Sequence, residues 1–92
     1  MMRVLFSPVV CDKKIDYEFN KEVITAIYEG ETDTFDFTGM PDGVLKEVDT
    51  VLTVNPIIEA RKENGVLSVI LTNFISKDAP DEEKFPEWQV IE

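Results

Sequence analysis

The dipeptide Asn64-Gly65 constrains the fold of this chain more than any other feature of its sequence. It separates two runs that are rich in apolar and β-branched residues, and Asn-Gly readily takes the two positive-φ positions of a type I′ turn. Residues 57–75 are therefore predicted to form a β-hairpin. The residues predicted to face each other across it are Glu63 and Val66, Lys62 and Leu67, Ala60 and Val69, and Ile58 and Leu71.

This register divides the hairpin into two different faces, because successive side chains of a strand point to opposite sides. One face is apolar, with Lys62 at its rim. The other face carries Glu59, Arg61 and Ser68. The apolar face is expected to be one half of a hydrophobic core.

Residues 14–38 are predicted to form a three-strand meander. Ile15, Tyr17 and Phe19 alternate with acidic residues, which is typical of a half-buried strand. Two-residue loops at Asn20-Lys21 and at Gly30-Glu31 would connect three strands, and both loops place the same residues on one side of the sheet. That predicted inner face consists of Ile15, Tyr17, Phe19, Ile24, Ala26, Tyr28, Phe35 and Phe37.

The remaining segments are less regular. Residues 3–6 are predicted to be a strand that ends at Ser7-Pro8, because proline cannot donate to a ladder. Residues 38–43 are dense in turn-forming residues. Residues 46–54 favour a strand over a helical turn because β-branched residues dominate their second half.

Together these patterns predict a mainly β fold, a small antiparallel sandwich or barrel-like domain. Packing the meander (about 14–38) on the C-terminal hairpin (about 57–75) would close one core, with at most one short helical turn. The single β domain is expected to span residues 1–76. Residues 77–92 are expected to be an acidic linker followed by an aromatic C-terminal tail.

Length and charge narrow the possible partners. Ninety-two residues are enough for one domain with a modest core. Nineteen acidic residues against nine basic ones give a net charge of -10, which repels phosphate backbones and anionic lipid headgroups. Neither nucleic-acid binding nor membrane binding is expected.

Cys11 is the only cysteine in the sequence, so an intramolecular disulfide is impossible. Residues 1–10 carry one arginine and a short apolar run broken by Pro8, which predicts neither a signal-peptide core nor a membrane span. The cytoplasm is the expected location.

The residues that enzymes use most often are missing. The sequence has no histidine, which removes the common nucleophilic triads and histidine-ligated zinc. Its four glycines are isolated and do not form a phosphate-binding loop. The acidic cluster at Asp78, Asp81, Glu82 and Glu83 lacks the ligand spacing of a calcium loop and is interpreted as a solvated linker. No catalytic, metal-binding or cofactor-binding residue is predicted, and no enzyme activity is expected.

The segment Phe85-Pro86-Glu87-Trp88 is the main candidate for a contact site. Two large aromatic residues beside a proline need a surface to pack on. They could fold back and close one end of the sheet, or Phe85, Pro86 and Trp88 could anchor a protein partner or a second subunit, since tryptophan is enriched at binding hot spots. Both alternatives remain open from the sequence.

An ordered series of short motifs resembles small uncharacterised proteins of phages and prophages in Gram-positive bacteria, which are often encoded in the tail or tail-fibre region. The resemblance covers most of the chain from Tyr28 onward. Its motifs are Thr34-Phe35-Asp36-Phe37, Met40-Pro41-Asp42-Gly43, Asn55-Pro56-Ile57-Ile58, Glu63-Asn64-Gly65-Val66-Leu67, Leu71-Thr72-Asn73-Phe74-Ile75 and Glu82-Glu83-Lys84-Phe85-Pro86-Glu87-Trp88.

The resemblance implies a context and no particular chemistry. It implies a tail-associated, assembly or accessory protein that works through protein contacts in the bacterial host or on the virion. Two alternatives are a structural protein that associates with itself and a binder of small molecules or cations that uses carboxylates.

Overall fold

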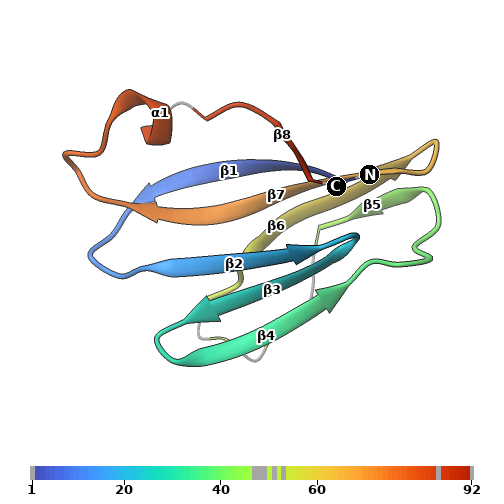
Figure 1. Ribbon diagram of the computed structural model, residues 1–92, viewed down its shortest axis with the longest axis horizontal. Helices are drawn as coiled ribbons and strands as arrows, with labels where there is room; N and C mark the ends of the chain where they lie inside the picture. The colour runs from blue at the N-terminus through green and yellow to red at the C-terminus, as the bar shows by residue number, and fades with distance from the viewer. Residues whose placement is uncertain (1, 47–49, 51, 53, 85, 92) are drawn as a thin grey trace.

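The computed structural model describes residues 2–46, 50, 52, 54–84 and 86–91. They form two β-sheets that face each other (Figure 1). The elements are β1 (Met2–Val10), β2 (Ile15–Asn20), β3 (Val23–Tyr28), β4 (Glu31–Asp36), β5 (Gly43–Leu45), β6 (Ile57–Glu63), β7 (Val66–Ile75), α1 (Asp81–Lys84) and β8 (Gln89–Ile91). The prediction of a mainly β sandwich with a meander and a hairpin is confirmed.

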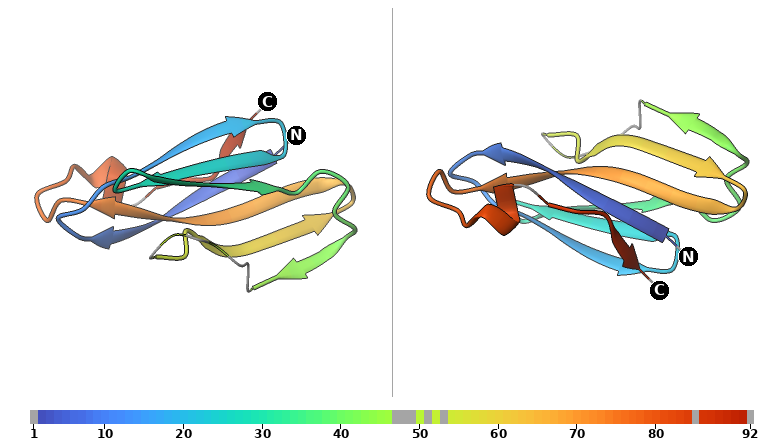
Figure 2. Two further views of the ribbon diagram at one scale, coloured as in Figure 1. Left: turned by 90° about the horizontal axis from the view of Figure 1, so that it is seen from below. Right: turned by 90° about the horizontal axis from the view of Figure 1, so that it is seen from above.

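The larger sheet has five strands in the order β5-β6-β7-β1-β8, and the smaller sheet is the meander β2-β3-β4. β1 runs parallel to β7 over its whole length, from the pair Met2 and Leu67 to the pair Val10 and Ile75. β8 then adds antiparallel to the first three residues of β1 (Figure 2). The larger sheet is therefore mixed, whereas the sequence predicted antiparallel pairing throughout.

The hairpin at Asn64-Gly65 forms as predicted. Both residues have positive φ angles, 51° and 78°, as a type I′ turn requires. The predicted register holds from Glu63 and Val66 to Glu59 and Ile70. It then shifts at a β-bulge, so that Ile57 rather than Ile58 faces Leu71.

The bulge turns Ile58 away from the core and leaves it 41% exposed. Hydrogen bonds from Ile57 N to Asn55 Oδ1 at 3.0 Å and from Thr72 N to the Pro56 carbonyl at 2.9 Å hold the chain there. The predicted pair of Ile58 with Leu71 is therefore wrong, because the backbone before β6 is held by contacts that the alternation pattern does not contain.

The meander has the predicted inner face but different loops. The turns are Lys21-Glu22 and Glu29-Gly30, each one residue away from the predicted pair. Glu29 and Gly30 both have positive φ angles, so this turn is of type I′ rather than II′. Moving a loop by one residue shifts the register by two, which keeps every side chain on its own face.

β1 continues through Pro8, where the sequence predicted an end. The Cys11 N–H donates to the Ile75 carbonyl at 3.1 Å, so the odd-numbered residues of β1 direct their N–H groups toward β7. The nitrogen of Pro8 consequently lies on the opposite side. β8 pairs only with residues 2–4 on that side, so the missing N–H of Pro8 removes no ladder bond.

The segment after the meander differs from its prediction. The short edge strand β5 at Gly43–Leu45 pairs with β6, at the end of the segment predicted to be a loop. Within the predicted strand 46–54, residues 47–49, 51 and 53 lie outside the described part of the chain, and Thr50, Leu52 and Val54 are not in a strand. Leu52 is nevertheless buried in the core.

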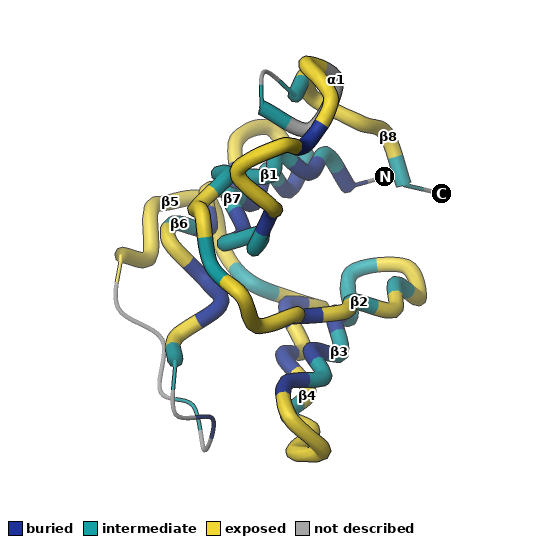
Figure 3. The backbone as a smooth tube through the Cα atoms, turned by 90° about the vertical axis from the view of Figure 1, so that its left-hand side faces the viewer, coloured by how far each residue is buried: buried dark blue, intermediate teal, exposed yellow. Residues whose placement is uncertain are grey.

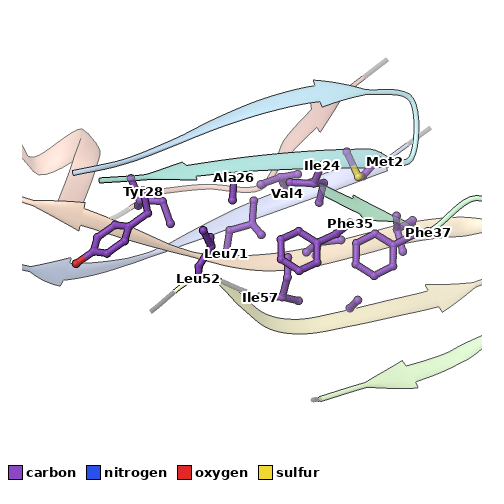
Figure 4. Packing of buried hydrophobic residues seen from close by; sticks show 14 residues of the cluster. Met2, Val4, Ile24, Ala26, Tyr28, Phe35, Phe37, Leu52, Ile57 and Leu71 are labelled. Carbon is purple, nitrogen blue, oxygen red and sulfur yellow. The ribbon is translucent and has the colours of Figure 1, made fainter. Parts of the chain in front are cut away.

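The core lies between the two sheets. Along β3, and along β7 as far as Leu71, buried residues alternate with half-buried ones, and Figure 3 shows buried stretches of backbone in both sheets. Figure 4 shows the rings of Phe35 and Phe37 lying between the sheets on the side of Ile57. The aromatic face of the meander is therefore core. Among the described residues, no helix has the length and apolar character needed to cross a membrane.

Candidate functional site

The C-terminal tail is part of the larger sheet, and it leaves Trp88 on the surface. In β8, Val90 is paired with Arg3 and Ile91 with Met2. Met2 is fully buried, so Arg3, Val90 and Trp88 lie on the outer face of the sheet. Trp88 is 41% exposed and Pro86 is half-buried. Phe85, the third residue of the predicted contact site, lies outside the described residues.

Arg3 holds the indole ring of Trp88 in place. The guanidinium carbon lies 4.7 Å from the centre of the ring, which is within the range of a cation–π contact. The Arg3 guanidinium therefore lies over the indole, while Trp88 as a whole remains 41% exposed. A fixed aromatic surface of this kind loses little side-chain entropy when it binds another molecule.

A row of residues crosses the outer face of the whole larger sheet at the level of Arg3. The strand registers align them side by side, one residue from each strand. From β5 to β8 this cross-sheet row consists of Val44, Arg61, Ser68, Arg3 and Val90. The two valines at its ends are 44% and 58% exposed.

The short side chain of Ser68 leaves a hollow between the two arginines. This hollow, called the Trp88 groove below, has a volume of about 360 Å³. A smaller hollow of about 220 Å³ extends it toward the hairpin turn at Asn64 and shares Arg3, Arg61, Glu63 and Ser68 with it. The Trp88 groove is lined by Arg3, Glu59, Arg61, Glu63, Ser68 and Trp88.

The two arginines of the groove differ in their charge partners. Arg61 lies 3.8 Å from a carboxylate oxygen of Glu59 and 3.4 Å from one of Glu63. Within the described residues, Arg3 makes no ion pair, and its charged group makes a cation–π contact with the Trp88 ring. The groove therefore offers guanidinium donors, carboxylate acceptors, a hydroxyl and an aromatic surface, which suit binding and provide no activated nucleophile.

A second hollow of about 360 Å³ lies at one end of the sandwich beside β4 and β5. Its walls are mostly apolar and include Phe35, Phe37, Met40 and Leu45. The Thr38 N–H donates to the Asp36 carboxylate at 2.9 Å, and this bond with that of the Thr38 hydroxyl holds the Asp36 pKa below its ordinary value. Asp36, the last residue of β4, thus stabilises the turn that follows it.

The other candidate residues do not come together as a site. Cys11 is half-buried with a free thiol, and its sulfur accepts the Lys13 N–H at 3.5 Å. Asp42 accepts the Asn64 N–H at 3.1 Å and so ties the 38–43 loop to the hairpin turn. Among the described residues, no three acidic or thiol side chains are grouped to hold a metal ion.

Sequence reasoning identified Trp88 and missed the arginines beside it. It placed Arg61 and Ser68 correctly on the polar face of the hairpin, but nothing connected that face to the tail. The alternation of Arg3 between Met2 and Val4 was a signal for an outward-facing arginine. Comparison with protein-family models, with curated proteins and with solved structures finds no match.

Proposed function

We propose that this protein is a non-enzymatic interaction module that binds a protein partner through the outer face of its larger sheet, with Trp88, next to the edge strand β8, as the anchor. The observation that carries this proposal is the cation–π contact at 4.7 Å, which fixes an indole that is 41% exposed. Tryptophan and arginine are the residues most often found to dominate protein interfaces.

The surroundings of Trp88 support the same function. The exposed valines of the cross-sheet row add apolar area on both sides of the groove, while the charged groups around Arg61 supply hydrogen-bond donors and acceptors between them. The resemblance to phage and prophage proteins of the tail region supports a partner from phage assembly or from the virion.

Site-specific photo-crosslinking tests the proposal. A photoreactive amino acid replaces Trp88 in one variant. In the matched control it replaces Lys21, which lies in an exposed turn of the other sheet. The photoreactive amino acid is one with an aromatic ring, so that position 88 keeps the aromatic surface that Trp88→Ala removes. In phage-producing cells we expect one protein to be crosslinked from position 88 and not from position 21. The same protein should co-purify with wild type and be lost with Trp88→Ala.

Two results together would contradict this function. One is that no protein is crosslinked from position 88. The other is that purified virions and assembly intermediates lack the protein. The module would then have to act through another surface or in another context.

A further inference from the structure

We infer that the Trp88 groove recognises an acidic side chain in an extended segment of the partner. This inference rests on the proposed function and specifies the chemistry of the partner. The carboxylate is received by Arg3 above Ser68, beside the indole of Trp88. Apolar residues of the same segment lie against the exposed valines at the two ends of the cross-sheet row.

The first reason is the unbalanced charge of Arg3. This arginine is half-buried in a sheet, and the described residues give it no carboxylate. Its guanidinium carbon lies 4.7 Å from the centre of the Trp88 ring, and a guanidinium carries five N–H donors in a planar fork that matches a carboxylate. A partner carboxylate can accept two of these donors at once and form the strongest kind of hydrogen-bonded ion pair.

The second reason is the position of Ser68 between two guanidinium groups. Neighbouring strands lie about 4.8 Å apart, so the Cα atoms of Arg3 and Arg61 are separated by about 10 Å across Ser68. Arg61 meets Glu59 and Glu63 at 3.8 Å and 3.4 Å, longer than the 2.7–2.9 Å typical of strong charged hydrogen bonds. Arg61 can therefore turn toward a new carboxylate without losing a tight pair.

The third reason is the shape of the surface. The cross-sheet row spans four strand spacings, or about 19 Å, which an extended peptide covers with about six residues. Its ends are apolar, and its middle carries two arginines, of which Arg61 is paired with Glu59 and Glu63 while Arg3 has no acidic partner among the described residues. A segment with an aspartate or glutamate near its centre and apolar residues on both sides matches this order.

Selection from a displayed library of random 12-residue peptides tests the inference. Peptides are selected for binding to the wild-type protein and depleted of those that also bind Trp88→Ala. Since Trp88 is the only tryptophan, its fluorescence then reports the affinity of each selected peptide. The proteins compared are wild type, Arg3→Gln, Arg3→Lys and the control Lys21→Gln.

We expect the selected peptides to share an acidic residue. Replacing it by its amide should weaken binding to the wild type about 10-fold or more, and should change binding to Arg3→Gln much less. For Arg3→Lys, the loss of affinity caused by the amide should lie between the losses measured with wild type and with Arg3→Gln. Lys21→Gln should bind the peptides like the wild type.

Different failures separate the inference from the proposed function. The inference would be overturned if the Trp88-dependent peptides lacked an acidic residue, or if the amide reduced affinity equally for wild type and Arg3→Gln. The proposed protein-binding function would still stand in either case. The absence of any Trp88-dependent peptide would overturn both.

Discussion

Lys62 shows how one charged residue is accommodated between the two sheets. It is only 8% exposed, and its ammonium nitrogen lies 3.1 Å from Oε2 of Glu22 in the turn between β2 and β3. This oxygen has no hydrogen-bond partner among the described residues, so the ammonium charge is what balances it. A pair of this kind adds little net stability, because desolvation offsets the attraction, but it favours one alignment of the sheets.

Tyr17 connects the sheets in a different way. Its hydroxyl donates a hydrogen bond to the Thr72 carbonyl in β7, and its ring lies 5.9 Å from that of Phe6 in β1. The half-buried ring thus belongs to the small sheet, while its polar end satisfies a carbonyl of the large one. Burial raises the pKa of the Tyr17 hydroxyl above its ordinary value.

This pKa shift predicts a loss of stability in alkaline solution. In the unfolded chain tyrosine ionises near pH 10, whereas the folded state keeps the proton on Tyr17 to higher pH. The unfolded state then binds fewer protons, so the free energy of unfolding falls as pH rises above about 10. Urea unfolding at pH 8, 10 and 11 measures this fall.

The variant Tyr17→Phe separates the two contributions of the hydroxyl. At pH 8 it should be less stable by about 1–2 kcal/mol, because the Thr72 carbonyl loses its donor. Between pH 8 and pH 11 it should lose less stability than the wild type. The remaining loss includes Tyr28, whose pKa is raised mainly by burial, and Lys13, whose pKa is raised by its hydrogen bond to Glu29. Parallel losses in the two proteins would contradict this assignment.

At the scale of elements, β1 is a long strand with one open side, along most of which no strand of the described residues is paired with it. β7 covers its other side completely, but β8 covers only residues 2–4. Strand edges of this kind invite pairing with another chain, and proline is one of the residues that prevent it. The nitrogen of Pro8 faces the open side, so Pro8 removes no hydrogen bond between β1 and β7. On the open side it offers no N–H to another strand, and this protects the edge of β1.

The variant Pro8→Val tests this protection. Valine suits a strand and supplies the missing N–H, so we expect thermal stability close to that of the wild type and greater self-association. Light scattering across a concentration series measures the association. The control is Ser7→Val, whose N–H points toward β7 and whose association should remain that of the wild type. Equal association of all three proteins would show that Pro8 does not guard the edge.

Turn chemistry explains which elements were predictable. Asn64-Gly65 specified both the existence and the register of its hairpin, because few dipeptides take two positive-φ positions easily. The turn at Glu29-Gly30 was placed one residue too late, since Glu29 at φ 48° is an unusual choice there. The faces were still right, because alternation with period two survives a register shift of two.

At the scale of the whole molecule, the two sheets share one core, and Val69 lies at its middle. Val69 is fully buried and is aligned with Val4 on one neighbouring strand and with Ala60 on the other. The core therefore depends on the hairpin, on β1 and on the meander at the same time. A single charge at this position affects all three.

Val69→Asp should unfold the protein at 25 °C. An unpaired buried carboxylate costs several kcal/mol, which is comparable with the whole stability of a domain of this size. The matched control is Ser68→Asp at the preceding position. The side chain of residue 68 lies on the outer face between two arginines, so an aspartate there should be tolerated. Circular dichroism and thermal unfolding measure both, and a cooperative transition of Val69→Asp near that of the wild type would refute this description of the core.

The sequence by itself determined the strands and their faces from Lys14 to Phe37 and from Lys62 to Ile75. These depend on turns and alternation, which act between residues close in the chain. Only the tertiary structure decided the parallel pairing of β1 with β7, the bulge at Ile58 and the addition of β8 to β1. The two pairings of β1 join segments more than 60 residues apart, and their choice depends on the packing of the whole core. The bulge depends on contacts of Asn55 and Pro56, which the alternation pattern does not contain. The candidate binding face is made by those same pairings, because they bring Arg3, Arg61 and Trp88 together.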